Sequence, residues 1–123
     1  MKLWYLDTSA VMKLIAQEKE SDALDEAILA ESPALFSSTL LETELRRACR
    51  FLPEIQPHII EDVIESMSIF EIDRSIFRVA GMLPGTHLRS LDAIHIAAAL
   101  LGGCTTMVTY DCLLYTSDAA DDS

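Results

Sequence analysis

The chain has 123 residues, of which 50% are apolar and 24% charged, and this composition fits one folded domain with its own core and excludes wholesale disorder. Its formal net charge of −11 excludes a protein that holds nucleic acid through a broad basic surface, although a local basic strip can still contact phosphates. Its apolar runs are too short to cross a bilayer or to form a secretory signal, so we expect no membrane anchor and a cytoplasmic location.

Short apolar runs alternate with helical patterns along the chain. The first half predicts, in order, a strand over 3–6, a helix capped by Thr8 or Ser9, a helix capped by Ser21 and closed by Pro33, a strand over 35–37, and a helix opened by a capping box of Thr39 and Glu42. The second half predicts a helix over about 55–64, a strand over 69–72, a helix that begins at Asp73 or Ser75, a helix capped by Ser90, and a strand over 105–109. Because parallel strands need long crossover connections and bury both faces, this alternation predicts a three-layer α/β/α sandwich around a short central parallel sheet.

Residues 1–111 make up the predicted domain. From Cys112 to Ser123 the chain shows weak helical periodicity and no closing strand. We therefore interpret 112–123 as an atypical C-terminal tail, and we expect the helix and strand that usually finish such a sheet to be missing or altered.

Acidic residues follow two of the predicted strands. Asp7 ends the first strand and Asp111 follows the last. In open parallel sheets ligands bind beyond the carboxyl ends of the strands, where the strand order reverses, so these two carboxylates meet if their strands are neighbours. Glu44 lies one turn into its helix and Asp92 in the first turn of another, and both are placed to project toward the same edge. The sequence therefore predicts that four carboxylates converge.

A cluster of four carboxylates needs positive charge. At an effective dielectric constant near 20, two charges about 5 Å apart repel by about 3 kcal/mol, and the cost recurs for each pair. The cluster must therefore hold protons or bind a cation, and an all-oxygen site without cysteine selects Mg²⁺ or Mn²⁺. The chemistry that follows is the attack of a metal-activated water on a phosphodiester.

Stretches of the sequence resemble the motifs of a known family. They are Leu6 to Ser9, Ser38 to Ala48, Arg89 to Ala99, and Val108 to Asp111. In their order and spacing they are similar to PIN domains, specifically the VapC-like ribonuclease toxins of bacterial and archaeal toxin-antitoxin pairs. The resemblance covers residues 1 to about 111.

The resemblance implies a PIN fold with a catalytic site for Mg²⁺ or Mn²⁺. It assigns the metal and the catalysis to Asp7, Glu44, Asp92 and Asp111, with supporting hydroxyls at Ser9 and Thr109. It also implies hydrolysis of RNA to 5′-phosphate and 3′-hydroxyl ends, and a homodimer silenced by a cognate antitoxin whose C-terminal segment lies across the acidic groove. The family continues past its fourth acid with a helix and a last strand, which the segment from Cys112 does not resemble.

Each candidate residue also has a purely structural interpretation. Asp7 can cap the first helix, and Asp92 can complement the N-terminus of its own helix. Glu44 can pair with Arg47 on the helix surface. We favour the metal role for the acids because carboxylates with perturbed pKa values gather at such strand ends. His95, among isoleucines and alanines, we interpret as a hydrogen-bonded core residue rather than one that orients a ligand.

Three arginines on one predicted helix have two equal interpretations. Arg46, Arg47 and Arg50 can contact RNA phosphates, or they can pair with Glu42 and Glu44 on the helix surface. The apolar helical positions we assign to the core or to a dimer face.

The leading hypothesis is a divalent-metal-dependent endoribonuclease, the toxin of a type II toxin-antitoxin pair. The alternative is a catalytically impaired module that binds antitoxin or RNA without cleaving it. A receiver or phosphatase domain also places an acid after its first strand. The chain lacks the acid two positions after Asp7, the lysine after the last strand, and the Gly-rich phosphate loop that such domains need.

Overall fold

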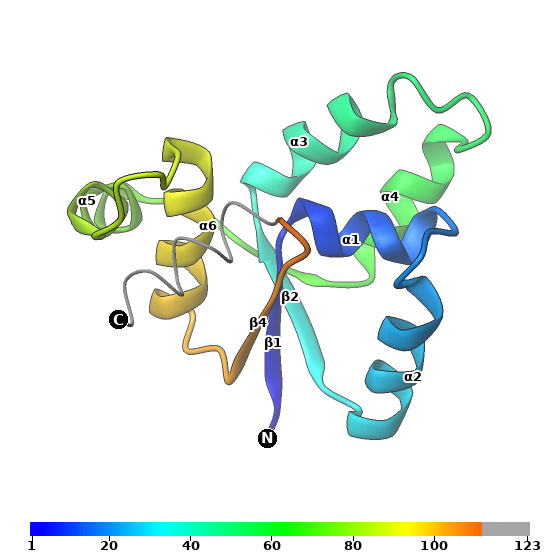
Figure 1. The fold of residues 1–123 in the computed structure, drawn as a ribbon, viewed down its shortest axis with the longest axis horizontal. Helices are drawn as coiled ribbons and strands as arrows, with labels where there is room; N and C mark the ends of the chain where they lie inside the picture. The colour runs from blue at the N-terminus through cyan, green and yellow to red at the C-terminus, as the bar shows by residue number, and fades with distance from the viewer. Residues whose placement is uncertain (112–123) are drawn as a thin grey trace.

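The computed structural model describes residues 1–111, and the expected tail over 112–123, with its missing or altered helix and strand, lies outside the described residues. Strands and helices alternate along the described chain (Figure 1). The elements are β1 (Leu3–Leu6), α1 (Thr8–Ile15), α2 (Ser21–Glu31), β2 (Ala34–Ser38), α3 (Leu40–Cys49), α4 (Pro57–Glu65), β3 (Ser68–Phe70), α5 (Arg74–Met82), α6 (Ser90–Leu101) and β4 (Thr106–Val108). The predicted order of strands and helices is confirmed.

The sheet is parallel, and its strand order reverses once. The strands lie in the order β3-β2-β1-β4, and β1 pairs with both β2 and β4. The chain adds β2 and β3 on one side of β1 before β4 returns to the other side, so the reversal falls between β1 and β4. The expected adjacency of the first and last strands is confirmed, with Leu6 opposite Val108.

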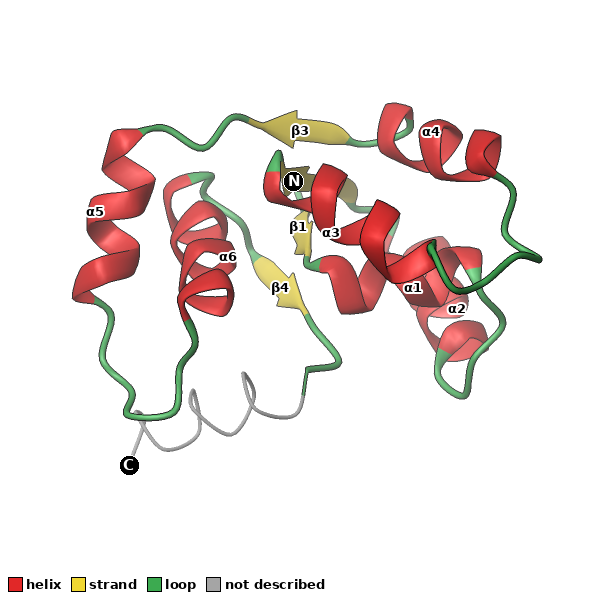
Figure 2. Ribbon diagram, turned by 90° about the horizontal axis from the view of Figure 1, so that it is seen from above, coloured by secondary structure: helices red, strands yellow, loops and turns green. Residues whose placement is uncertain are grey.

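Helices cover both faces of the sheet (Figure 2). Helices α1 to α4 pack on one face, against Trp4 and Leu6, and helices α5 and α6 pack on the other, against Tyr5 and Phe36. Successive residues of β1 thus point to opposite faces, as the two-residue period of a strand requires. The three-layer α/β/α sandwich is confirmed. No helix within residues 1–111 has the length and apolar character that crossing a membrane requires.

Aspartates cap two of the helices. Asp7, rather than the predicted Thr8 or Ser9, caps α1, because its carboxylate accepts a hydrogen bond from the Ala10 amide at 3.0 Å. Asp73 caps α5 in the same way, which confirms it as the start of that helix. The first of these caps matters for function, since it fixes the side chain that ends β1.

Thr39 occupies the predicted position before α3, but the capping hydrogen bonds expected of Thr39 and Ser21 do not form, because both hydroxyls bond outside the helix that they were expected to cap. The Thr39 hydroxyl accepts a hydrogen bond from the Ile72 amide at 3.4 Å, and no capping box forms at the start of α3. The Ser21 hydroxyl donates to the Ala16 carbonyl at 3.0 Å, so it ties α2 to the loop before it. Ser90 is already the first helical residue of α6.

Candidate active site

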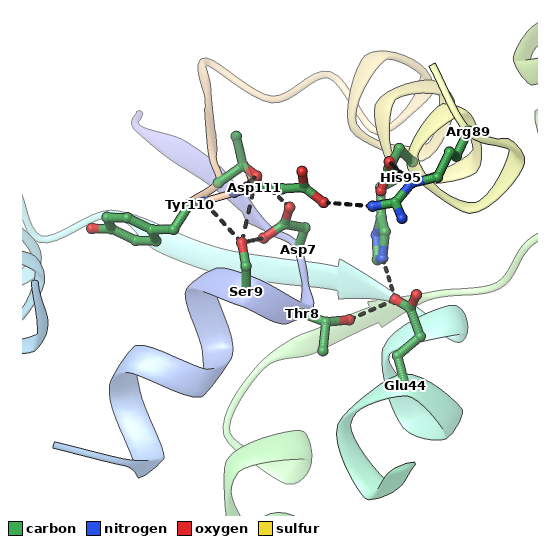
Figure 3. A network of polar contacts seen from close by, with 10 residues as sticks. Asp7, Thr8, Ser9, Glu44, Arg89, His95, Tyr110 and Asp111 are labelled. Carbon is green, nitrogen blue, oxygen red and sulfur yellow. Dashed lines mark hydrogen bonds and ion pairs between the residues drawn. The ribbon is translucent and has the colours of Figure 1, made fainter. Parts of the chain in front are cut away.

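Asp7 stands at the carboxyl end of β1, where the strand order reverses, and it is 4% exposed. Its Oδ1 accepts hydrogen bonds from the Ser9 hydroxyl at 2.6 Å and from the Ala10 amide at 3.0 Å. Its Oδ2 accepts a hydrogen bond from the Thr109 hydroxyl at 2.5 Å. Asp7 therefore caps α1 and is also held in one orientation at the edge of the sheet (Figure 3).

Two hydroxyls join the ends of β1 and β4. The Ser9 hydroxyl donates to Asp7 and accepts a hydrogen bond from the Tyr110 amide at 2.8 Å. The Thr109 hydroxyl also donates to Asp7, and it accepts from the Asp111 amide at 3.1 Å. Both residues predicted to support the site thus lie against Asp7, and Thr109 links that carboxylate to the backbone of Asp111.

Glu44 reaches the same edge from α3. Its Oε1 accepts hydrogen bonds from the Thr8 hydroxyl and from Nε2 of His95, each 2.6 Å long. Partial burial raises the pKa of Glu44, but these two hydrogen bonds outweigh burial and hold the pKa below its ordinary value. The carboxyl is therefore ionised at neutral pH. Within residues 1–111 it forms no ion pair with Arg47, the structural partner that the spacing suggested.

Asp92 and Asp111 share one guanidinium. Nε of Arg89 lies 3.3 Å from Oδ2 of Asp92, and Nη2 lies 3.5 Å from Oδ2 of Asp111. Burial raises the pKa of Asp92, the neighbouring Asp111 carboxylate raises it further, and Arg89 opposes both effects. Burial is the larger of the two effects that disfavour the ionised form of Asp92, and repulsion from Asp111 adds to it.

Thr109 and Arg89 link three of the acids, Asp7, Asp111 and Asp92, in one network of hydrogen bonds and ion pairs. Glu44 belongs to a second group, with Thr8 and His95 (Figure 3). Within residues 1–111, no three His, Cys, Asp or Glu side chains are grouped closely enough to hold a metal ion. The side-chain atoms available as metal ligands at this edge are carboxylate and hydroxyl oxygens, which are the ligands that Mg²⁺ and Mn²⁺ prefer. A bound cation would also favour the ionised form of Asp92, which burial and the neighbouring Asp111 disfavour. In the chemistry of their oxygen atoms, the residues present therefore fit a hard divalent cation.

The arginines of α3 do not share a single environment. Arg46 forms an ion pair with Glu61 of α4 at 2.6 Å and a longer one with Glu42 at 3.9 Å, so the structural interpretation holds for this residue. The guanidinium of Arg50 lies over the ring of Phe51, 4.6 Å from its centre. A cavity of about 410 Å³ between α3 and α4 is lined in part by Arg46 and Arg50.

The sequence alone does not assign a role in the site to two residues at this edge, Thr8 and Arg89. The ion pair of Arg89 could have been predicted from the sequence, because an arginine three positions before Asp92 has the spacing of a helical ion pair. The contact of Thr8 could not have been predicted, because its partner Glu44 is 36 positions away along the chain. His95 is 3% exposed and hydrogen-bonded on both ring nitrogens, which confirms its interpretation as a core residue and also brings it into contact with Glu44.

Comparison with known proteins identifies the fold family. A family model described as the PIN domain matches residues 4–116. Ribonuclease VapC35 of Mycobacterium tuberculosis is 43% identical over 113 residues, which cover 87% of this chain and 83% of that protein. Ribonucleases VapC46 and VapC47 of the same organism are 35% identical over 109 residues and 34% identical over 113, with the same shares covered. The chain therefore belongs to the PIN domain family, as a VapC-like member.

Proposed function

We propose that this protein is a divalent-metal-dependent endoribonuclease that hydrolyses RNA phosphodiester bonds, and that it is the toxin of a type II toxin-antitoxin pair. The observation that carries the proposal is the buried Asp7 carboxylate, which Ser9 and Thr109 fix where the strand order reverses. Glu44 and Asp111 lie on the same edge, and Arg89 joins Asp92 to Asp111. The relatives from Mycobacterium tuberculosis are named ribonucleases, and this supports RNA as the substrate. RNA is present in the cytoplasm, which is the location that we expect.

The metal that we expect is Mg²⁺ or Mn²⁺. The residues that we expect to hold it, and to carry the catalysis, are the acids of this edge, Asp7, Glu44, Asp92 and Asp111. When bound, such a cation activates water as the nucleophile and stabilises the leaving oxygen of the phosphodiester. The chain itself supplies orientation, because Ser9 and Thr109 fix both oxygens of the buried carboxylate at the end of β1.

The proposed macromolecular partners are RNA, an antitoxin and a second copy of the chain. Arg47 lies on the helix that also carries Glu44, and Arg50 directly follows that helix, so these two arginines supply positive charge suited to RNA phosphates. Arg46 would have to leave its ion pairs with Glu61 and Glu42 to contact RNA. A basic antitoxin segment would complement the acidic edge and the net charge of −11. Exposed apolar side chains on α5, among them Phe77 at 55% and Met82 at 77%, support a homodimer through that part of the surface.

A module that binds RNA or antitoxin without cleaving is the second candidate function. The observation that favours it is the separation of the four acids, since no three potential ligands within residues 1–111 are grouped closely enough for a metal ion. Such a module would keep its affinity for RNA in the presence of EDTA and would release no product.

A cleavage assay distinguishes the two functions. Single-stranded RNA labelled at one end is incubated with the full chain in Mn²⁺, in EDTA, and with two variants, Asp92→Asn at the acidic edge and Asp25→Asn on the exposed surface of α2 as a matched control. We expect cleavage in Mn²⁺ by the wild type and by Asp25→Asn, none in EDTA, and loss of cleavage in Asp92→Asn. Products with 5′-phosphate ends support the hydrolytic route. Equal cleavage by Asp92→Asn and wild type would refute the proposed site.

A further inference from the structure

A chain of buried polar groups runs from the interior of the sheet to the acidic edge. Tyr5 of β1 and Ser38 of β2 are fully buried, and His95 of α6 is 3% exposed. These linked groups end at Glu44, and no step of the proposed reaction uses Tyr5, Ser38 or His95. Buried polar groups that are fully hydrogen-bonded fix the geometry of their neighbours, so these groups can fix the position of the Glu44 side chain.

The distances in this chain are short. The Tyr5 hydroxyl lies 2.9 Å from Oγ of Ser38 and 2.6 Å from Nδ1 of His95. Nε2 of His95 lies 2.6 Å from Oε1 of Glu44. The imidazole ring is therefore held at both nitrogens, between the buried phenol of Tyr5 and the carboxylate of Glu44. Figure 3 shows the contact between His95 and Glu44.

Counting protons settles which nitrogen donates to Glu44. The Tyr5 hydroxyl carries one proton, which goes either to Nδ1 of His95 or to Ser38. In the first case Nδ1 is the acceptor, so the neutral ring carries its proton on Nε2. In the second case Nδ1 must itself donate to the phenol oxygen, and Nε2 is protonated as well because it faces a carboxylate. Both arrangements place a proton on Nε2, directed at Oε1 of Glu44.

Both hydrogen bonds to the Glu44 carboxylate are made to the same oxygen. His95 and Thr8 both bond Oε1, and within residues 1–111 no side chain or amide forms a hydrogen bond with Oε2. A carboxylate held by two donors on one oxygen has a fixed plane and presents its second oxygen in one direction. Hydrogen-bonded partners of this kind behind a metal-binding carboxylate typically change metal affinity by about 10- to 100-fold when they are removed.

We infer that His95 is a positioning residue for Glu44: its Nε2–H group, with the ring orientation set by Tyr5, holds Oε1 and leaves Oε2 available to the cation. The inference rests on the proposed function, because it assumes that Glu44 binds the metal. It assigns His95 a role in the site in addition to its place in the core.

Two amide variants separate this role from simple packing. In His95→Gln the side-chain amide nitrogen can occupy the place of Nε2 and still donate to Glu44, whereas in His95→Asn the shorter amide reaches only the place of Nδ1, beside Tyr5. Mn²⁺ is titrated into the full chain by calorimetry, and thermal unfolding in EDTA is recorded for each variant. We expect His95→Asn to bind Mn²⁺ at least about 10-fold more weakly than wild type and His95→Gln to stay within about 3-fold. Equal affinity in wild type and a folded His95→Asn overturns the inference.

A measurement on the wild type covers the case in which a variant does not fold. Long-range ¹H–¹⁵N spectra of the imidazole, recorded in EDTA, report which ring nitrogen of His95 carries a proton. We expect protonated Nε2, with a resonance that shifts in Glu44→Gln, and a neutral ring protonated only on Nδ1 overturns the inference. A wild type with this spectrum that nevertheless binds no Mn²⁺ overturns the proposed metal site while leaving the hydrogen bond to Glu44 intact.

Discussion

Replacing Asp7 by asparagine or by alanine separates its structural role from its charge. The carboxylate accepts hydrogen bonds from Ser9, Ala10 and Thr109. Asparagine keeps one oxygen for the first two donors, and its amide can donate to the Thr109 hydroxyl oxygen. Alanine keeps none of these bonds and also removes the cap of α1. The two variants therefore differ in structure, whereas both lack the negative charge.

The magnitudes follow from the same contacts. Loss of the helix cap costs about 1 kcal/mol, and each hydrogen bond to a charged group contributes about 1.5–3 kcal/mol net. Asp7→Ala loses the cap and the bonds from Ser9 and Thr109, so we expect it to lower the free energy of unfolding by about 4–7 kcal/mol. Asp7→Asn replaces the two bonds to a charged group by neutral ones worth about 0.5–1.5 kcal/mol each, so we expect a loss of about 2–3 kcal/mol. Cleavage should fall at least about 100-fold in both variants, because loss of a metal ligand should cost at least as much as loss of its outer hydrogen-bond partners.

The assay pairs urea unfolding in EDTA with RNA cleavage in Mn²⁺, at the same protein concentration. A folded Asp7→Asn that has lost cleavage assigns the loss to charge rather than to unfolding. Two results would refute the reasoning. If Asp7→Asn unfolds as readily as Asp7→Ala, the hydrogen bonds are not the stabilising feature, and if Asp7→Asn cleaves at the wild-type rate, the carboxylate does not carry the chemistry.

Three further predictions follow from the charges at the edge. Burial and the neighbouring Asp111 raise the pKa of Asp92, so ionisation of Asp92 opposes folding. In EDTA at pH 7, Asp92→Asn should therefore have a higher melting temperature than the wild type. The difference in melting temperature should disappear as the pH falls to about 4 and below, near the pKa of aspartate in the unfolded chain. Partial burial raises the pKa of Glu44, but its hydrogen bonds to His95 and Thr8 lower the pKa by more, so the net shift is downward. Ionised Glu44 therefore stabilises the fold fully at a pH above its pKa in the unfolded chain. This stabilisation is lost as the pH falls through its pKa in the folded protein. The difference in unfolding free energy between wild type and Glu44→Gln should therefore shrink below about pH 4.3, and a difference constant with pH contradicts this assignment. Arg47→Ala should weaken RNA binding and reduce the salt slope by about 1 without changing Mn²⁺ affinity, as measured by fluorescence anisotropy across a salt series.

Much of the fold was predictable from the sequence because it rests on local patterns. The apolar run before Asp7 and the β-branched run before Asp111 mark two strands, and the helices between them require parallel connections. The adjacency of β1 and β4 was a hypothesis from topology, and the strand pairing confirms it. The PIN domain match extends over residues 4–116, in agreement with the resemblance drawn from the motifs.

The finer arrangement of the site was not predictable in the same way. Thr8 and Ser9 have the right chemistry to cap α1, yet Asp7 caps it, because its carboxylate is fixed from both sides of the strand reversal. The capping box at Thr39 did not form, because its hydroxyl bonds the Ile72 amide far along the chain. Such choices depend on tertiary neighbours, which no local pattern contains.

Calorimetric titration of Mn²⁺ into the full chain, Asp7→Asn and Asp92→Asn tests the central claim most directly. The claim is that carboxylates from the end of β1 and the start of α6 serve one cation. In this structure Thr109, Asp111 and Arg89 connect these two carboxylates. We expect the wild type to bind Mn²⁺ at millimolar concentration or tighter and both variants to lose that binding. Mn²⁺ binding that is absent in the wild type, or unchanged in either folded variant, would contradict the claim.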